Sequence, residues 1–207
     1  MLLPLDPAAP SLVAALEGDP FYRSISIGFG QDVSAGREAL ARYFTYSISE
    51  ASALGRCVRP SDPALGVATW LLPVSEAVHQ RVAAGKRAFL HENLSPAGAA
   101  NYDRIIEFMH AKSATVVPAG AWYLSIIAVA PSAQGRGLGQ QLLAPTLAEA
   151  DARGAATYLE TFTQRNLVFY QRLGFSPVAN FHEPTSNSDY HLLTREAPSA
   201  PLKVPAH

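Results

Sequence analysis

The sequence predicts a mixed α/β domain in which helices flank one central sheet, an architecture of the α+β type. In the second half of the chain, apolar runs bounded by Pro and Gly alternate with segments of helical periodicity. The strongest run, AWYLSIIAVA at 121–130, stops at Pro131, and a glycine-rich stretch that opens a helix follows it. The 207 residues are enough for one sizeable domain with a substantial core.

Each expected element follows from periodicity and from the residues that end it. Strands are expected at 55–59, 65–73, 121–130 and 156–162, with 175–181 and 189–194 as a final hairpin. Helices are expected at 35–52, 74–92, 97–112, 137–153 and 166–173. Pro145 should bend the 137–153 helix. Residues 1–10, which contain three prolines, and the Pro/Ala-rich tail at 196–207 are expected to be irregular and weakly held.

Composition argues against several functional classes. A net charge of −1 gives no basic footprint for nucleic acid. The single cysteine, Cys57, forms no intramolecular disulfide or thiolate zinc site and is interpreted as a small core residue. HEN at 91–93 does not extend to a zinc motif, so no metal is expected. The start lacks the features of a signal peptide, and no apolar run reaches the ~20 residues of a membrane helix. A cytoplasmic protein without a membrane partner is therefore expected.

The stretch VAPSAQGRGLGQQLL at 129–143 indicates an anion site at a strand-to-helix junction. The start of a helix offers unpaired N–H groups, and the glycines Gly135, Gly137 and Gly139 let a phosphate approach the backbone. A tight turn without a ligand is the alternative. Two common nucleotide loops do not fit, because a P-loop requires Lys-Ser/Thr after the last glycine and the dinucleotide fingerprint requires glycine at the position of Gln140.

Two stretches in the same order resemble the core motifs of the GNAT superfamily of N-acetyltransferases. Gln134-x-x-Gly137-x-Gly139, directly after a strand ending in AVAP, resembles the acetyl-CoA signature of that family. YLETFTQRNLVFYQRLGF at 158–175 resembles its second motif, and with VATWLLP at 67–73 the chain looks most like the branch containing puromycin N-acetyltransferase. The resemblance covers about 120–176. The N-terminal part of the sequence departs from the family's pattern, because the family's first strand looks reduced or lost there.

The resemblance implies a single GNAT-like domain over 1–195, with a largely antiparallel twisted sheet splayed between two adjacent strands. It implies a cofactor core at about 120–176 that binds acetyl-CoA as co-substrate, and a helical segment at about 74–117 on the substrate side. The pantetheine arm would bind along Ile127, Ala128 and Val129. The remaining cofactor contacts implied are Gln134, Gly135, Arg136, Gly137, Leu138, Gly139, Gln140, Asn166 and Tyr170.

The resemblance also implies the catalytic groups. Tyr170 would donate a hydrogen bond to the departing thiolate, and Glu160 is the candidate base for the attacking amine. His91, Glu92, Glu107 and His110 lie in the helical segment that would cover the acceptor, although each is more commonly a surface or core residue. Trp70, Trp122 and Tyr123 are expected in the core, and one of them is a candidate for lining the acceptor pocket.

Three functional hypotheses remain open. The leading one is direct acetyl transfer from acetyl-CoA to a primary amine of a small molecule in a ternary complex. The second has a peptide or protein N-terminus or lysine as acceptor, which requires an open groove. The third is a catalytically silent domain that binds or senses acyl-CoA. The sequence leaves open whether the protein is a monomer or a homodimer.

Overall fold

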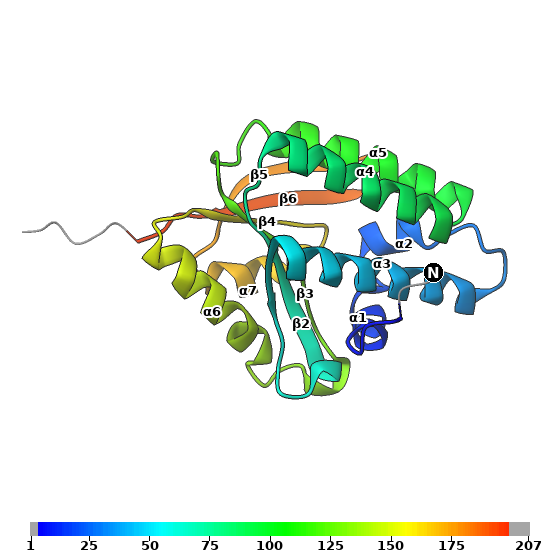
Figure 1. Cartoon of the computed structure of the whole chain (residues 1–207), viewed down its shortest axis with the longest axis horizontal. Coiled ribbons are helices and arrows are strands. Elements are labelled where there is room, and N and C mark those ends of the chain that lie inside the picture. Colours follow the sequence, from blue (N-terminus) through cyan, green and yellow to red (C-terminus); the bar gives the residue numbers. More distant parts are fainter. Residues whose placement is uncertain (1–3, 199–207) are drawn as a thin grey trace, which may run out of the picture.

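A six-stranded sheet organises the chain in the computed structural model, which describes residues 4–198 (Figure 1). Its strands are β1 (Gly55–Val58), β2 (Gly66–Leu71), β3 (Trp122–Val129), β4 (Thr157–Thr161), β5 (Ser176–Glu183) and β6 (Ser188–Arg195). The spatial order is β1-β2-β3-β4-β6-β5, and β3 with β4 is the parallel pair among antiparallel neighbours. The predicted mixed, largely antiparallel sheet is confirmed.

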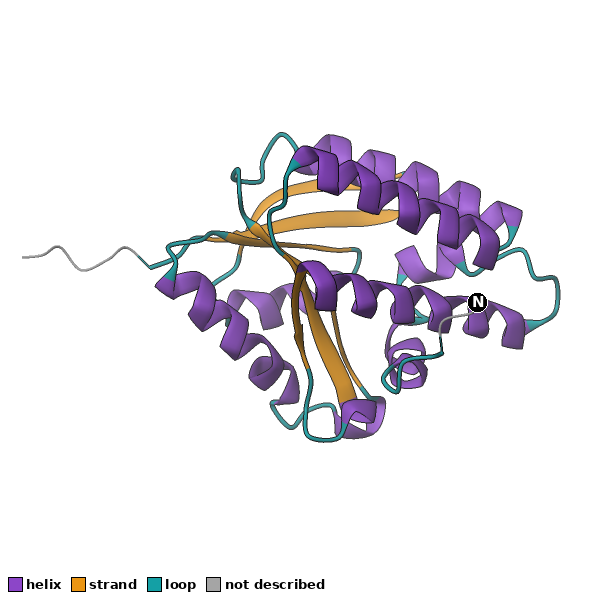
Figure 2. Ribbon diagram, in the orientation of Figure 1, coloured by secondary structure: helices purple, strands orange, loops and turns teal. Residues whose placement is uncertain are grey.

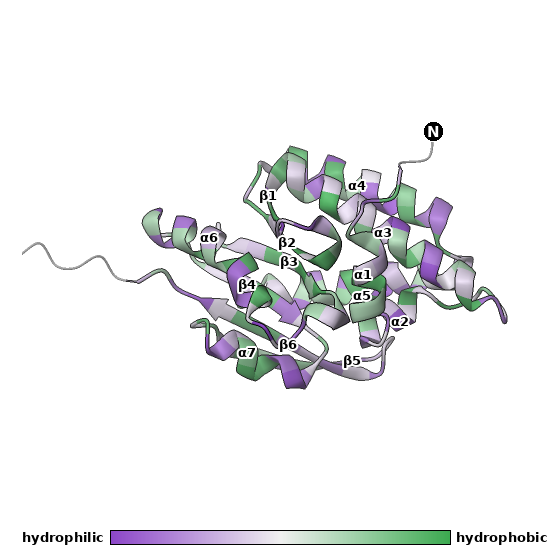
Figure 3. Ribbon diagram, turned by 90° about the horizontal axis from the view of Figure 1, so that it is seen from below, coloured by the Kyte–Doolittle hydropathy of each residue, from purple (hydrophilic) through white to green (hydrophobic). Residues whose placement is uncertain are grey.

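Helices cover both faces of this sheet (Figure 2). They are α1 (Ala9–Leu16), α2 (Pro20–Ile25), α3 (Val33–Leu54), α4 (Glu76–Asn93), α5 (Pro96–Ser113), α6 (Leu138–Ala152) and α7 (Leu167–Gln171). One apolar core lies between the sheet and α1–α5, and a second lies between the sheet and α6 with α7. Each of the longer helices carries both hydrophobic and hydrophilic residues, as expected of amphipathic helices on a sheet (Figure 3).

A β-bulge in β3 changes the core that its side chains join. Thr69 of β2 pairs with Ile126 and Trp70 pairs with Leu124, so Ser125 is the extra residue on β3. Leu124 lies in the core under α6, whereas Ile126 lies in the core under α1–α5. The bulge therefore turns the second half of β3 relative to the first.

The ladder between β3 and β4 is short. The two strands pair at Trp122↔Thr157, Tyr123↔Tyr158 and Leu124↔Leu159, and the pairing then stops. Beyond this point the strands diverge, so that β2 and β3 run away from the direction of β4, β5 and β6 (Figure 1). This confirms the predicted splay between two adjacent strands.

The N-terminal region is irregular over residues 4–8, as expected, and α1 begins at Ala9. It is not weakly held, because Ala8 and Ala9 are buried. Within residues 4–54 the chain forms α1, α2 and α3 and no strand, which agrees with the expected loss of the family's first strand. Pro10 occupies the first turn of α1, where its missing N–H costs no helical hydrogen bond. Asp19 caps α2, and Pro20 is its first residue.

The expected tail falls mostly outside the described residues, which end at 198. Residues 196–198 form neither helix nor strand. Within residues 4–198, no helix combines the length and the apolar character needed to cross a membrane.

Close packing joins α2 to α5. Gly98 is buried in the first turn of α5, and a Cβ atom there would overlap the carbonyl oxygen of Ile25 at the end of α2. Asn101 of α5 donates a hydrogen bond of 2.8 Å to the carbonyl oxygen of Ser24, so the same two helices are also joined by a polar contact. Glycine at position 98 thus sets the distance between them.

We therefore expect Gly98→Ala to lower the free energy of unfolding by about 2 kcal/mol, because the added methyl group forces α2 away from α5. Urea unfolding followed by circular dichroism measures this change. Gly85→Ala is the matched control: it lies exposed in α4 with only the Tyr46 hydroxyl nearby, at 3.4 Å, and should stabilise the helix by up to ~1 kcal/mol. Equal effects of the two substitutions would contradict the packing argument.

Candidate active site

Three adjoining cavities surround the point where β3 and β4 separate. A central cavity of about 110 Å³ lies in the gap between the strands. A glycine-loop cavity of about 710 Å³ lies on one side and shares Leu16, Asp19, Ile127, Asn166 and Tyr170 with it. A helical pocket of about 760 Å³ lies on the other side and shares Ile106, Met109, Tyr123 and Glu160 with it. The central cavity therefore adjoins two larger spaces.

The glycine loop forms a concave backbone surface at the start of α6. Gly135 and Gly137 have left-handed φ values of 75° and 78°, and a Cβ atom on either would meet open space. Gly137 is the N-cap of α6 and provides no side-chain cap, and the first helical bond runs from Gln141 N to Gly137 O at 3.1 Å. The backbone N–H groups of the first turn thus lack helical partners and suit an anion such as a phosphate.

Most of the predicted cofactor residues line the glycine-loop cavity. They are Ile127, Ala128, Val129, Gln134, Gly135, Gly137, Leu138, Gly139, Gln140, Asn166 and Tyr170. Arg136 is exposed and is not among the lining residues. The Gln134 side chain donates a hydrogen bond of 3.0 Å to the carbonyl oxygen of Val129, which ties the loop to the end of β3.

The free edge of β3 can be assigned from its ladder with β2. Ala130 N donates to Leu65 O at 2.8 Å, and the register continues with Ala128 opposite Val67. Because bonded and non-bonded pairs alternate in an antiparallel ladder, the backbone groups of Ala128 face β2, whereas those of Ile127 and Val129 face the gap. Within residues 4–198, Ile127 therefore presents unpaired N–H and C=O groups to the cavities. Val129 presents an unpaired N–H group, since its carbonyl oxygen accepts the hydrogen bond from Gln134.

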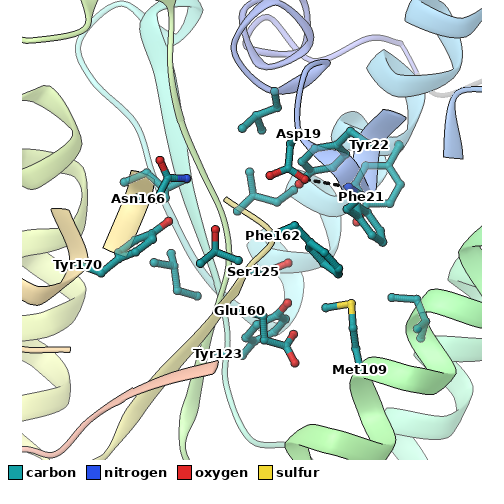
Figure 4. A pocket seen from close by; sticks show the side chains of 17 residues that line it. Asp19, Phe21, Tyr22, Met109, Tyr123, Ser125, Glu160, Phe162, Asn166 and Tyr170 are labelled. Atoms are coloured by element: carbon teal, nitrogen blue, oxygen red, sulfur yellow. Dashed lines mark hydrogen bonds between the residues drawn. The ribbon is translucent and has the colours of Figure 1, made fainter. Parts of the chain in front are cut away.

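Tyr170 and Asn166 reach the gap from α7 and its N-cap (Figure 4). They are four residues apart, and both line the central and glycine-loop cavities. Tyr170 is buried, with Phe175 and Phe169 edge-on to its ring. Burial and, secondarily, the negative charge of Asp19 raise the pKa of the Tyr170 hydroxyl, so this group keeps its proton.

Glu160 lies on β4, one residue beyond the last pair with β3. The Tyr190 hydroxyl, from β6, donates a hydrogen bond to its carboxylate. Burial raises the pKa of Glu160, and the hydroxyl groups of Tyr190 and Tyr123 oppose this shift in part. A carboxyl group with a raised pKa, at the junction of two cavities, holds a proton more readily than an ordinary carboxylate and is suited to acting as a base.

Asp19 is a second acidic residue in this site, and the sequence analysis did not identify it. It lines the central and glycine-loop cavities from the start of α2. Its carboxylate accepts hydrogen bonds from Phe21 N at 3.0 Å and from the Thr163 hydroxyl at 2.8 Å, while burial raises its pKa. It thus connects the N-terminal helices to the loop that carries Asn166. The pair Asp19-Pro20, a helix-start signal, is the sequence feature that could have indicated it.

Aromatic side chains form much of the wall of the central cavity. Those from α2, α3, β3, α7 and the end of β4 are Phe21, Tyr22, Tyr43, Tyr123, Phe162 and Tyr170. Figure 4 shows Phe162 between Asp19 and Glu160, with Met109 of α5 on the far side from Tyr170. Aromatic faces next to carboxylates form a surface that attracts ammonium groups.

Some of the other residues that the sequence suggested for the acceptor side line the helical pocket. Glu107, His110 and Tyr123 line it. His91 and Glu92 do not, and His91 lies 2.9 Å from the Asp103 carboxylate on the exposed side of α4 and α5. Trp70 and Trp122 are buried in the core under α6, as predicted, and Cys57 is half-buried beside the other core. Among the described residues there is no group of three or more His, Cys, Asp or Glu side chains arranged to hold a metal ion.

Comparisons with known proteins identify this architecture. Residues 89–177 match the family model of the acetyltransferase (GNAT) domain. A structure described as histone acetyltransferase HPA2 and related acetyltransferase, from Corynebacterium glutamicum, is 21% identical, with 94% of this chain and 92% of that chain covered and a TM-score of 0.58. Polyamine N-acetyltransferase from Drosophila melanogaster is 12% identical, with 91% and 92% covered and a TM-score of 0.57.

A third match is partial. The ribosomal-protein-S18-alanine N-acetyltransferase from Escherichia coli is 24% identical over 42% of this chain, which spans 61% of that protein, with a TM-score of 0.35. The two longer matches show that this chain has the GNAT fold. The family model adds a similarity to the GNAT acetyltransferase domain over residues 89–177, which is less than half of the chain.

Glu160→Gln tests how the burial of the Glu160 carboxylate changes the free energy of unfolding with pH. Because the pKa of Glu160 is raised in the folded state, stability is lost as the pH rises from the unfolded-state pKa of ~4.3 through the folded-state pKa. The glutamine side chain of the variant does not titrate but retains an acceptor for the Tyr190 hydroxyl. We expect the free energy of unfolding of the variant, relative to that of the wild type, to increase between pH 4 and pH 8.

Urea titrations at several pH values measure this difference. Glu92→Gln, at an exposed site in α4, is the control and should show no such increase. A difference for Glu160→Gln that stays constant between pH 4 and pH 8 would contradict the burial of a titrating carboxylate.

Proposed function

We propose that this protein is an N-acetyltransferase that moves an acetyl group from acetyl-CoA to a primary amine of a small molecule by direct transfer in a ternary complex. The observation that carries the proposal is the meeting of two large cavities at the gap between β3 and β4. Tyr170 and Glu160 lie on opposite sides of that gap, as an acid and a base for the transfer would (Figure 4).

The glycine-loop cavity fits acetyl-CoA. The backbone N–H groups at the start of α6 suit the pyrophosphate, and Gly135 and Gly137 leave open the space that a Cβ atom would fill. The unpaired backbone groups of Ile127 and Val129 suit the amide groups of the pantetheine arm. Exposed Arg136 lies close enough in sequence to serve as a charged contact for the phosphates.

The residues around the central cavity supply the proton transfers. Glu160 accepts a proton from the acceptor's ammonium group, which frees the nitrogen lone pair. The nitrogen bonds to the thioester carbonyl carbon, and the C–S bond breaks with its electron pair on sulfur. The nitrogen then loses its second surplus proton, which leaves the neutral amide and protonates the thiolate to the thiol of CoA. Tyr170 donates a hydrogen bond to the thiolate as it leaves, and an unpaired β3 N–H group stabilises the carbonyl oxygen during the attack.

The helices on the acceptor side favour a small-molecule acceptor. Helices α3, α4 and α5 together with the ends of β2 and β3 line the helical pocket, whereas a peptide acceptor requires an open groove. The presence of Tyr170 and Glu160 beside the glycine loop favours an enzyme over a silent acyl-CoA-binding domain. The likeness to the puromycin N-acetyltransferase branch stays a prediction, as does a cytoplasmic location.

Free-thiol release from acetyl-CoA, measured over a panel of amines, aminonucleosides, polyamines and peptides, tests this function. We expect thiol release with at least one small primary amine, and mass spectrometry should show the product heavier by one acetyl group. Tyr170→Phe should lower kcat by ~100-fold or more with little change in the KM for acetyl-CoA, because the ring is kept and the acid is lost.

Tyr46→Phe is the matched control, since the Tyr46 ring packs on Phe89, outside all three cavities. It should leave kcat unchanged. Full activity of Tyr170→Phe would remove the acid assignment. Tight CoA binding without thiol release across the whole panel would overturn the proposal in favour of a binding domain.

A further inference from the structure

The residues that line the helical pocket indicate the charge and the polarity of the acceptor. The pocket lies between α3, α4 and α5 and adjoins the central cavity, with which it shares Ile106, Met109, Tyr123 and Glu160. A molecule whose amine reaches Glu160 therefore extends its remaining atoms into this pocket. The side chains of the pocket then decide which acceptors bind.

Much of the pocket wall is aliphatic. Leu54 comes from the end of α3, Leu71 and Leu72 from the end of β2, Val82 from α4, and Ile106 with Met109 from α5. Transfer of methylene groups from water onto such surfaces is favourable by about 0.8 kcal/mol each. The pocket thus suits an acceptor with an alkyl or similarly apolar middle section.

The positive charges in the pocket wall are already neutralised. Lys86 lies 2.7 Å from the Glu50 carboxylate, with side-chain exposures of 12% and 7%, and its ammonium also faces the Tyr43 ring. Arg87 contacts both oxygens of Asp103 at 2.8 and 2.7 Å. Each cation has its own carboxylate, so neither is available to bind an anionic acceptor without breaking an existing pair.

Two carboxylates in the pocket wall lack such a partner. Glu107 and Glu160 form no ion pair within residues 4–198, and Glu160 is held by the neutral hydroxyl of Tyr190. Glu160 lies at the inner end of the pocket beside the central cavity, whereas Glu107 is exposed on α5 and does not line the central cavity. The uncompensated charge of the wall is therefore negative and is present in two places.

We propose that the acceptor is a dicationic amine with an apolar spacer between its two nitrogen groups. This inference rests on the proposed function. The reacting ammonium lies at Glu160, the spacer lies on the aliphatic wall, and the second cation lies at Glu107. Acceptors with a carboxylate or phosphate at the distal end bind poorly, because they meet Glu107 and find both pocket cations occupied.

Three matched series of amines test this inference at pH 8, where imidazole side chains are commonly neutral. The probes are 1,n-diaminoalkanes of four to ten carbons, the n-alkylamines of equal length, and the ω-amino acids of equal length. At the chain length that gives the highest kcat/KM, we expect the diaminoalkane to have the largest value, the alkylamine a smaller one and the ω-amino acid the smallest. The advantage of the diamine over the alkylamine should be about fivefold, as for a partly exposed ion pair, and should shrink in high salt.

Glu107→Gln should reduce the diamine-to-alkylamine ratio to about one, and Glu107→Lys should make the ω-amino acid better than the diamine. The ratio is measured within one variant, so partial unfolding does not change it. Glu92→Gln is the control, since Glu92 is an exposed glutamate on α4 outside the pocket, and it should keep the wild-type ratio.

The outcomes separate the two claims. Thiol release with alkylamines but with no preference for diamines, or with a preference for ω-amino acids, would overturn the inference and leave the proposed function standing. A diamine preference that survives Glu107→Gln would also overturn it. Absence of thiol release with every probe and across the whole amine panel, under conditions where CoA binds, would overturn both.

Discussion

The interrupted ladder between β3 and β4 is the constraint on which the rest of this structure depends. The two strands pair at three positions and then separate, although buried backbone groups strongly prefer to be paired. The bulge at Ser125 turns β3, and α7 and the N-terminal helices occupy the space that opens. The result is a strand whose unpaired groups, at Ile127 and Val129, face a cavity instead of a neighbouring strand.

Several acidic side chains that are harder to ionise than usual lie together at the gap. Burial raises the pKa of Glu160, of Asp19 and of Tyr170, and all three line the central cavity. Hydrogen bonds from Tyr190 and Thr163 keep the two carboxylates in place. Such a gathering of perturbed groups around one small cavity is typical of catalytic sites, where they are useful for proton transfer.

The part of the fold with strong periodicity could be predicted from the sequence. The strand ending at Pro131, the helix opened by Gly137 and the short helix carrying Tyr170 all lie close to their expected places. The first helices were not predicted, because α1 and α2 are short and contain proline. Asp19 and the aromatic wall from Phe21 and Tyr22 were missed for the same reason.

Other features have no local signal at all. The bulge at Ser125 occurs within a largely apolar run, and it is defined only by the pairing of β3 with β2. The neutralisation of Lys86 by Glu50 joins residues 36 positions apart and depends on how α3 packs beside α4. Long-range packing, which no window of sequence contains, therefore determines both the shape of the gap and the charge of the helical pocket.

The central claim is that the open edge of β3 receives the pantetheine arm of CoA, and amide hydrogen exchange measured residue by residue by NMR tests it most directly. Saturating CoA should slow exchange at the N–H groups of Ile127 and Val129 by at least about tenfold. The N–H of Ala128, which the ladder places toward β2, should change much less. Binding of CoA with unchanged exchange at Ile127 and Val129 would contradict the account.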